Sequence, residues 1–509
     1  MVDPLKAPAI HPGSVGASGA YASRVVGQRP SSDVACRVRD ALEAEQARRL
    51  AAFPMPEFEG WPGGSAATAP SQRATSSESS GRARMPAPAP VRSVYVHAPF
   101  CSRRCAYCDF AVQVGRVGDL GGWERAIKGE LRAIAYEGRF PLAAELDTLY
   151  VGGGTPSLLG AGAMTALAGA LGPERLRSPT LEWTAEANPE SFTADLATEW
   201  RRAGVNRVSL GVQSFHGPTL AWLGRMHGPE GAREAVATAR AAGLTNLSLD
   251  LMFGLPEGRA GERDWECDLD RLLELEPPHV SLYGLSVEPT TPLARTLARG
   301  RVRPASEERY RDEYLHSVER LTRAGYLHYE VSNFCLPGRH SRHNRVYWEG
   351  GSYLGLGNAA HSFSDPLRRW NVRDWEDYAP RASRGELAVA GEEEVGGDAR
   401  RLERVWLGLR TDRGLPWDSV VAAASRLVER WIRRGWARRE SGASAEGRTD
   451  PDHGGGRLRL TAEGWLLLDR LTVELDVALA QAPNDAPPLE GLGDAGACES
   501  LTTARQPRD

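Results

Sequence analysis

Residues 95–110 read YVHAPFCSRRCAYCDF, and this stretch decides the fold and the chemistry that the sequence predicts. It places Cys101, Cys105 and Cys108 at the spacing C-x3-C-x2-C. A short loop with this spacing can turn three thiolates toward one centre. Three thiolates hold three corners of a [4Fe–4S] cluster and leave one iron open, whereas ordinary electron-transfer clusters are closed by a fourth cysteine. An open iron can bind a substrate group instead.

A zinc site is the alternative interpretation of the same loop. His97 lies four residues before Cys101, so a tetrahedral Cys3His site is conceivable. Zinc sites usually take their ligands from two separated knuckles, and the sequence holds no second CxxC pair. Disulfides are disfavoured because three clustered cysteines leave one odd. The remaining four cysteines are scattered: Cys36, Cys267, Cys335 and Cys498.

Length, charge and hydropathy limit the class of protein. A chain of 509 residues has room for about two to four domains. The formal net charge of -4, from 62 basic and 66 acidic residues, gives no electrostatic case for nucleic acid as a partner. No apolar run reaches the length that crosses a bilayer, and the N-terminus lacks the pattern of a secretory signal. These features predict a soluble, cytoplasmic protein with reduced cysteines, and peripheral contact with a membrane stays open.

The two ends of the chain differ in composition from its middle. Residues 1–90 are poor in core-forming side chains and rich in glycine, alanine, serine and proline. We therefore predict a disordered N-terminal extension that ends in a flexible linker over 63–90. A hydrophilic loop insertion is predicted at 440–455, and a disordered tail at 481–509.

From residue 91, apolar β-type runs alternate with helical patterns, which predicts a parallel sheet with helical crossovers. Strands are expected at 92–97, 146–151, 181–187, 207–212, 246–252 and 279–285, with helices near 122–137, 160–171, 193–203, 228–242 and 264–275. Six such units predict an α/β fold, a partial (β/α)6 barrel over 91–300 rather than a closed eightfold one. In barrel enzymes the chemistry lies at the C-terminal ends of the strands.

Polar or glycine-rich residues follow every one of these strands, and they include the cysteine loop, Gly152-Gly153-Gly154-Thr155, Glu186 with Asn188-Pro189, Gln213, Asp250 and Gly284. Their occurrence at all six ends indicates that one rim of the barrel forms a single site. Asp250 lies in an apolar strand, where an unpaired carboxylate would be costly. It therefore needs a partner, and Arg225 or a ligand hydroxyl are the candidates.

The cysteine motif, with Tyr107 in the aromatic slot of C-x3-C-x-aromatic-C, resembles the signature of radical S-adenosylmethionine (SAM) enzymes. In that family the open iron binds the amino and carboxylate groups of SAM, and the reduced cluster cleaves SAM to methionine and a 5′-deoxyadenosyl radical. Further motifs, YxHxPFC, GGGTP, ExNP, SxGVQSF, DLMFGLP and LYxLxxEPxT, resemble the coproporphyrinogen III oxidase-like branch, from about residue 92 to residue 475. The resemblance implies SAM contacts at Tyr95, Tyr107, Gly153, Gly154, Thr155, Glu186, Gln213, Arg225, Asp250 and Gly284.

Residues 301–385 are predicted to extend the barrel, beginning with a helix at 304–324. The motif His343-Asn-x-x-Tyr-Trp348 resembles that of HemW-type heme chaperones, which bind heme and deliver it to acceptor apo-hemoproteins. The resemblance implies that His343 is a heme ligand, and a neutral imidazole is a common axial ligand of heme iron. The alternative is that His343 only supports the barrel mouth.

Residues 386–480 form a separate pattern. Helices near 399–410 and 418–436, followed by a short strand pair, predict a winged-helix-like domain. The balanced charge disfavours DNA binding, and the resembling family carries such a domain as a cap, which is the role we expect here.

Two function classes follow from the resemblance. One is an oxygen-independent coproporphyrinogen III oxidase, which decarboxylates two propionates. The other is a heme chaperone that holds a [4Fe–4S] cluster, SAM and heme without oxidase activity. The oxidases resemble C-x3-C-x2-C-x-C, and here Phe110 stands at the position of the fourth cysteine. Phe110 and the His343 motif both favour the chaperone, so we expect a radical SAM protein that lacks coproporphyrinogen oxidase activity, with heme held close to the cluster.

Overall fold

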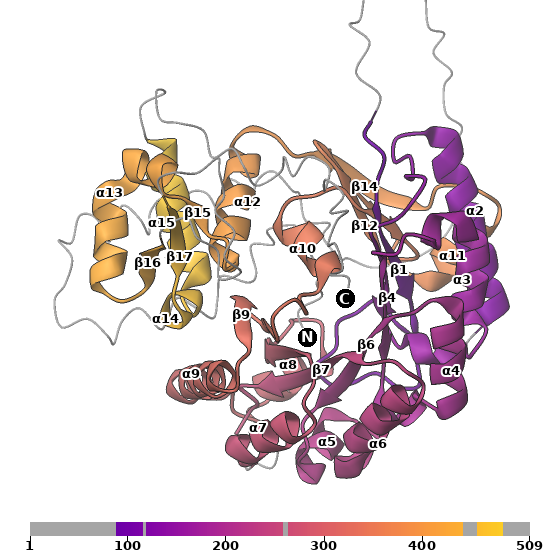
Figure 1. Ribbon diagram of the computed structural model, residues 1–509, viewed down its shortest axis with the longest axis horizontal. Coiled ribbons are helices and arrows are strands. Elements are labelled where there is room, and N and C mark those ends of the chain that lie inside the picture. The colour runs from indigo at the N-terminus through magenta and orange to yellow at the C-terminus, as the bar shows by residue number, and fades with distance from the viewer. Residues whose placement is uncertain (1–87, 116–118, 258–262, 441–455, 482–509) are drawn as a thin grey trace, which may run out of the picture. The chain divides into compact units, whose positions relative to one another are not determined.

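The computed structural model describes residues 88–115, 119–257, 263–440 and 456–481 (Figure 1). The predicted N-terminal extension, the tail and the loop insertion therefore lie outside the described residues, apart from their innermost positions. No described helix combines the length and the apolar character that a membrane span requires.

The centre of the fold is a nine-stranded sheet in the order β11-β1-β4-β5-β6-β7-β8-β10-β9. Six neighbouring strands run parallel and confirm the six predicted ones: β1 (Ser93–Ala98), β4 (Thr148–Gly153), β5 (Glu182–Ala187), β6 (Arg207–Gln213), β7 (Asn246–Phe253) and β8 (His279–Gly284). The order ends at β11 and β9, so the predicted partial barrel is confirmed.

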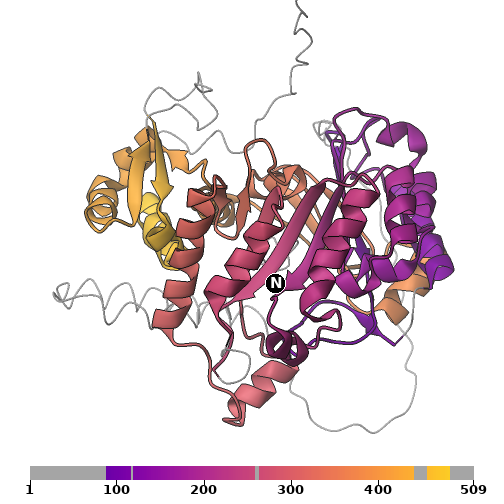
Figure 2. The same ribbon diagram turned by 60° about the horizontal axis from the view of Figure 1, so that its bottom comes forward.

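Helices between the strands cover the outer face of the curved sheet (Figures 1 and 2). The predicted crossovers are confirmed by α2 (Leu120–Glu137), α3 (Ala163–Leu171), α4 (Ala194–Ala203), α6 (Gly228–Ala241) and α7 (Trp265–Glu274). Helix α5 (Gly217–Leu223) was not predicted. Short 3-10 helices occur at Pro156–Leu159, Pro173–Leu176 and Pro189–Ser191. The helix predicted at 304–324 is α9 (Glu307–Arg323), which follows α8 (Pro292–Ala298). Both ends of α2 carry capping residues. The Asp119 carboxylate accepts a hydrogen bond from the amide of Gly122, and Gly138 ends the helix in the left-handed conformation.

The parallel strands are buried on both faces, but the two faces differ in chemistry. On β4, Leu149 and Val151 join the apolar core that lies between the sheet and the outer helices. Thr148 and Tyr150 alternate with them and point to the other side, because successive strand residues face opposite ways. The same alternation places serines, charged residues and histidines on the inner face of β5 to β8. The barrel interior is therefore polar, and the apolar core is the layer outside it.

Strands that the sequence analysis did not predict flank the six. At one edge, β11 (Leu354–Leu356) runs parallel to β1. At the other edge, β10 (Asn333–Cys335) pairs antiparallel with β8, and β9 (Leu327–Glu330) with β10. Helix α10 (Arg342–Trp348), which carries the predicted heme motif, lies on the inner side of the sheet (Figure 1).

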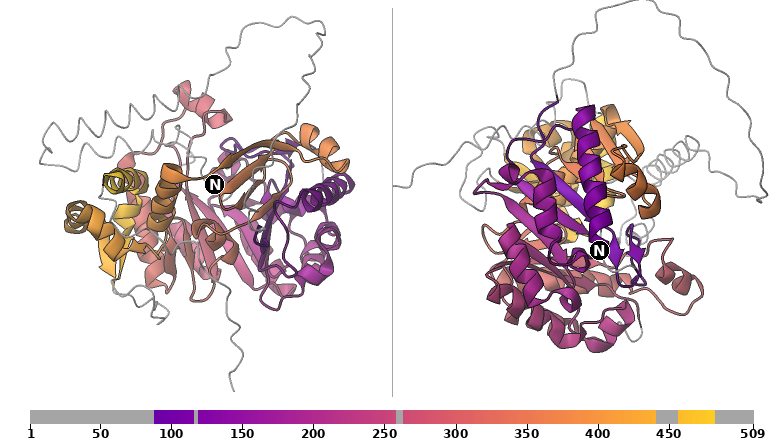
Figure 3. Two further views of the ribbon diagram at one scale, coloured as in Figure 1. Left: turned by 90° about the horizontal axis from the view of Figure 1, so that it is seen from above. Right: turned by 90° about the vertical axis from the view of Figure 1, so that its right-hand side faces the viewer.

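A small antiparallel sheet follows, made of β12 (His361–Ser364), β13 (Leu367–Asn371) and β14 (Val389–Glu394). Helix α11 (Trp375–Ser383) packs beside α2, whose helical layer faces the viewer in the right-hand view of Figure 3. Neither element was predicted.

The C-terminal part contains the helices and the strand pair that were predicted there. They are α12 (Gly397–Arg410), α13 (Trp417–Arg433), β16 (Ala437–Glu440) and β17 (Arg457–Leu460), joined by β15 (Leu415–Pro416), α14 (Ala462–Trp465) and α15 (Leu468–Ala480). The three strands form an antiparallel sheet in the order β15-β17-β16. The winged-helix assignment and the domain boundaries at 300 and 385 stay predictions.

Candidate functional site

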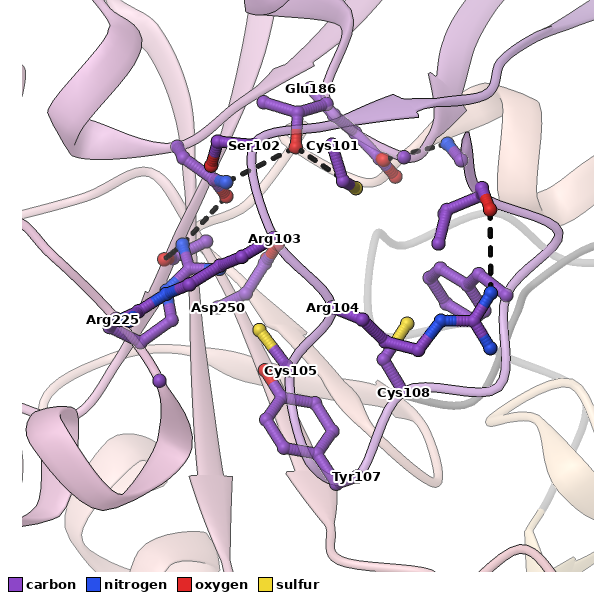
Figure 4. A pocket seen from close by; sticks show the side chains of 18 of the residues that line it. Cys101, Ser102, Arg103, Arg104, Cys105, Tyr107, Cys108, Glu186, Arg225 and Asp250 are labelled. Carbon is purple, nitrogen blue, oxygen red and sulfur yellow. Dashed lines mark hydrogen bonds between the residues drawn. The ribbon is translucent and has the colours of Figure 1, made fainter. Parts of the chain in front are cut away.

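A cavity opens at the C-terminal ends of the parallel strands (Figure 4). Its volume is ≈ 1180 Å³, including space open to solvent. It is the place where the structure brings together ten of the predicted site residues: Cys101, Cys105, Tyr107, Cys108, Gly153, Gly154, Thr155, Glu186, Arg225 and Asp250. The expectation that one rim of the barrel gathers these residues is therefore met.

The cysteine loop connects two short strands, β2 (Phe100–Cys101) and β3 (Gln113–Val114), which pair with each other. Within the loop the amide of Cys108 donates to the carbonyl of Cys105 over 3.2 Å. The three sulfur atoms face the same central space (Figure 4). Burial raises the pKa of the Cys101 thiol to about 12 and also raises the pKa of Cys108. Both thiols therefore need a positive centre, such as iron, to become thiolates.

The zinc alternative required His97 as a fourth ligand, and the structure gives His97 other partners. Its Nδ1 lies 3.0 Å from the Tyr95 hydroxyl, and its Nε2 lies 3.0 Å from the carbonyl oxygen of Ala111. Among the described residues, no group of three or more histidine, cysteine, aspartate or glutamate side chains converges on one metal ion. A [4Fe–4S] cluster does not require such convergence, because each cysteine binds a different iron. The donor set therefore fits a cluster better than a zinc ion.

Glycine is required at the end of β4 because larger side chains would clash there, and not only because the chain turns. Gly153 has φ 109°, and a Cβ atom there would lie 2.3 Å from Cε1 of His97. A Cβ atom on Gly154 would lie 2.7 Å from the carbonyl oxygen of Phe100, which is backbone and cannot move aside easily. The glycines therefore let the end of β4 pack directly against the strand that leads into the cysteine loop.

Glu186 is held at the cavity wall by two donors. The Tyr150 hydroxyl donates to its Oε1 over 2.7 Å, and the amide of Gly153 donates to its Oε2 over 3.1 Å. The position of this carboxylate is thus set by β4 and β5 together, and it presents negative charge to the cavity.

A chain of contacts runs from the cysteine loop to Arg225. Thr155 Oγ1 lies 3.6 Å from the Cys101 sulfur and accepts from Asn188 Nδ2 over 3.2 Å. Arg225 Nη2 in turn donates to Asn188 Oδ1 over 2.6 Å and to the carbonyl of Gly211. The buried Nε of Arg225 has no hydrogen-bond partner among the described residues. An orphaned guanidinium N–H at the cavity fits an anionic ligand group such as a carboxylate.

Asn188 was expected at the rim of the barrel but was not among the predicted SAM contacts. It links Thr155 to Arg225 and lines the cavity itself. The signal for it was present, because Asn188 is the asparagine of the ExNP motif after the third predicted strand.

Asp250 has serine partners rather than Arg225. Ser209 Oγ lies 3.2 and 3.1 Å from its two carboxylate oxygens, and Ser248 Oγ lies 3.2 Å from Oδ1. Burial raises the pKa of Asp250 in spite of these donors. The carboxylate lines the cavity and is available there to ligand hydroxyl groups.

Three predicted SAM contacts do not line the cavity. Tyr95 is buried beside His97. Gly284 allows Tyr310 to pack closely, since a Cβ atom there would lie 1.9 Å from the Tyr310 hydroxyl oxygen. Gln213 is fully buried with φ 69°, and both polar atoms of its amide have no hydrogen-bond partner among the described residues. A strained, unsatisfied glutamine is a common sign of a ligand contact.

His343 lies below the cavity, beside the N-terminal half of β4, and its ring stacks on Tyr150, whose hydroxyl donates to Glu186 at the cavity wall. Its Nδ1 is 2.7 Å from Thr148 Oγ1, and Thr148 is the first residue of β4, whereas the cavity residue Gly153 is the last. The length of β4, about 16 Å, separates these two residues. The Nε2 of His343 is 2.7 Å from the Tyr347 hydroxyl, and burial lowers the pKa of the ring to about 3. The structure therefore does not bring His343 together with the cysteines, and both of its ring nitrogens are engaged.

Comparison with known proteins places this geometry in a family. A family model described as the Radical SAM superfamily matches residues 95–264. The heme chaperone HemW of Mycobacterium tuberculosis (strain ATCC 25618 / H37Rv) is 38% identical over 391 residues, which cover 75% of this chain and 94% of that protein. The chain belongs to the HemW family of radical SAM proteins. The HemW of Lactococcus lactis subsp. lactis (strain IL1403) is 34% identical over 323 residues, covering 64% of this chain and 82% of that protein.

A solved structure shares the fold of this HemW family member. Coproporphyrinogen III oxidase (HemN) from Escherichia coli, described as a radical SAM enzyme, matches with a TM-score of 0.60 and 23% identity. The match covers 77% of this chain and 91% of that chain. At this identity the likeness concerns the fold alone.

Proposed function

We propose that this chain is a heme chaperone that holds a [4Fe–4S] cluster, binds SAM and delivers heme to acceptor hemoproteins, in the cytoplasm. The observation that carries the proposal is Phe110, which lines the cavity beside the three cysteines. In the oxidase pattern C-x3-C-x2-C-x-C a fourth cysteine stands at this position. A phenyl ring offers neither a thiolate nor a proton there, so the cavity lacks a group that distinguishes the oxidases. Relatives named as heme chaperones support the same proposal.

The cavity residues fit the two cofactors. Cys101, Cys105 and Cys108 would hold the cluster, and the missing fourth cysteine leaves one iron for SAM. Arg225 has an orphaned N–H for the methionine carboxylate, and Asp250 has a carboxylate for ligand hydroxyls. When bound, the reduced cluster and SAM supply one-electron cleavage of SAM. This chain contributes the placement: it orients a carboxylate from β5 and a guanidinium from the α5–α6 connection toward one cavity.

Heme is proposed to bind next to α10. His343 would be a ligand of the heme iron, and for this it would first have to leave Thr148 or Tyr347, because each of its nitrogens is occupied. The low pKa of His343 keeps the ring neutral, which is the form that binds iron. Heme capture by His343 would therefore require a local opening of α10, and the cluster would be held apart from it by the three cysteines at the cavity.

The test uses the full chain, reconstituted anaerobically with iron and sulfide. One sample receives SAM and coproporphyrinogen III, and the formation of protoporphyrinogen IX is followed after oxidation by fluorescence. A second sample is titrated with heme, and its transfer to apo-myoglobin as a probe acceptor is followed at the Soret band. We expect heme binding and transfer without decarboxylation. Protoporphyrinogen IX formation would assign the chain to the oxidases instead. The variant Phe110→Cys is the matched control for the role of this position in the cavity.

A further inference from the structure

A continuous chain of hydrogen-bonding groups leads from Asp250 across the polar interior of the barrel. Ser248 Oγ lies 3.2 Å from Asp250 Oδ1 and 2.8 Å from Nδ1 of His279. Nε2 of His279 lies 2.7 Å from the Tyr329 hydroxyl. The same hydroxyl accepts a hydrogen bond from the amide of Ser341 over 3.3 Å. The four side chains come from β7, β8 and β9 and are all buried.

The two ends of this chain reach two different hollows. Asp250 lines the large cavity that holds the cysteines. Tyr329 lines a second, smaller hollow of ≈ 280 Å³ including space open to solvent, bounded also by Arg345, Trp348, Glu349, Thr411, Asp412 and Arg413. A ligand that fills the large cavity would cut Asp250 off from water at the mouth. The chain through Ser248 and His279 would then be its connection to the second hollow.

The direction of each hydrogen bond follows from the number of protons available. An ionised Asp250 cannot donate, so Ser248 gives it its single hydroxyl proton. Ser248 must then accept from His279, which places the ring proton on Nδ1. The bare Nε2 must in turn accept from the Tyr329 hydroxyl. All donors therefore point the same way, from the second hollow toward Asp250.

We propose that Tyr329, His279 and Ser248 form a proton relay that carries a proton between the second hollow and Asp250 in the cavity. In the inward step, hydronium in the second hollow gives a proton to Tyr329 and becomes water, and Tyr329 passes its own proton to Nε2 of His279. The ring releases its Nδ1 proton to Ser248, and Ser248 passes its hydroxyl proton to Asp250. Each relay group gains one proton and loses one, and within the protein only the carboxylate changes charge, from negative to neutral. The reverse movement resets the relay.

The surroundings favour transfer without a charged histidine. Burial, and then the charge of Arg207, lower the pKa of His279 well below 6.5, so the ring stays neutral and only its tautomer changes. Burial raises the pKa of Tyr329 well above 10, so the hydroxyl keeps a proton to pass on. The titratable and charged groups that face Asp250 and His279 from the neighbouring elements are Arg207, Tyr283, Tyr150, Glu186, Glu330 and His340.

The relay can be tested on the chain without any cofactor. The full chain is labelled with ¹⁵N-histidine and ¹³C-aspartate, and the His279 ring and the Asp250 carboxyl are assigned with the variants His279→Gln and Asp250→Asn. While Asp250 is ionised, the proton must lie on Nδ1 of His279. As the pH falls and Asp250 becomes protonated, the proton must move to Nε2, at the same pH and without formation of imidazolium. The ¹⁵N shifts of the two ring nitrogens distinguish these forms.

Two variants separate a relay from a merely structural network. In Ser248→Ala the tautomer should no longer follow the Asp250 titration. Ser209→Ala is the matched control, because Ser209 contacts both carboxylate oxygens of Asp250 but lies off the path from His279 through Ser248, and there the coupled switch should persist. In the wild type, a ring proton on Nε2 of His279 while Asp250 is ionised would by itself overturn the proposal. An unchanged switch in Ser248→Ala would overturn it as well.

Discussion

Replacing Glu130 by glutamine should remove a pH dependence from the stability of this protein. Glu130 lies on α2 and is buried. It accepts hydrogen bonds from the amide of Gly357, from Asn371 Nδ2 and from the Tyr378 hydroxyl. These contacts tie α2 to the segment after β11, to β13 and to α11. Burial outweighs the three donors and raises the pKa of Glu130 from 4.5 to about 7.

The sign and the size of the effect follow from this pKa. Between pH 4.5 and about pH 7 the folded chain binds more protons at this site than the unfolded chain, so its stability falls as the pH rises. The full contribution is about 3.5 kcal/mol, since one pKa unit corresponds to about 1.4 kcal/mol, and about 2.5 kcal/mol of it lies between roughly pH 5 and 8. It is present at low pH and is lost as the pH passes the folded pKa.

The assay is urea unfolding of the wild type and of Glu130→Gln at several pH values across that range, followed by tryptophan fluorescence. The difference in unfolding free energy between the two proteins isolates Glu130, because other groups titrate equally in both. The glutamine amide changes the unfolding free energy by the same amount at every pH, so this change does not affect how the difference varies with pH. We expect the wild type to lose its advantage over the variant by about 2.5 kcal/mol from roughly pH 5 to 8. A difference that stays constant over this range would refute the assignment of a raised pKa to Glu130.

Three further outcomes are expected at the cavity and at α10. Cys105→Ser should abolish the visible iron–sulfur absorbance after reconstitution, to roughly the level without iron, whereas the same change at Cys335, a buried cysteine of β10, should keep it. Gly154→Ala should lower stability by about 1–3 kcal/mol in urea unfolding, because its Cβ atom meets backbone. His343→Ala should weaken heme binding in a Soret titration and leave the cluster absorbance unchanged. His340→Gln is its control, and equal heme affinity in both variants would exclude the ligand role.

The six central strands were predictable because each is a short, buried run bounded by turn residues. Strand β11 was not, because it has only three residues, Leu354–Leu356. Its partner β1 lies at the other end of the barrel sequence, and only tertiary packing joins them. The helix at 307–323 was predictable from its apolar stripe, whereas α11 contains Pro380, which local preferences disfavour inside a helix.

The cavity was predictable in part because the C-terminal ends of parallel strands meet at one rim. That rule located Glu186 and Asp250 without the structure. It says nothing about residues beyond the barrel, so the sequence could not tell which end of the barrel receives His343. The expected position of heme close to the cluster therefore stays a prediction. The hydrogen-bond partners of Asp250 could not be predicted either, because serines at alternate strand positions look like ordinary strand residues.

Helix α10 has seven residues, fewer than the roughly 12–15 that an isolated helix needs in water. Its first two amides donate to Glu182 at the start of β5, and its His343 ring stacks on Tyr150. Its helical form therefore depends on docking against the sheet. Hydrogen exchange of its backbone amides should then report undocking of the whole segment rather than fraying. An exchange experiment on the heme-free chain would time how often His343 becomes exposed.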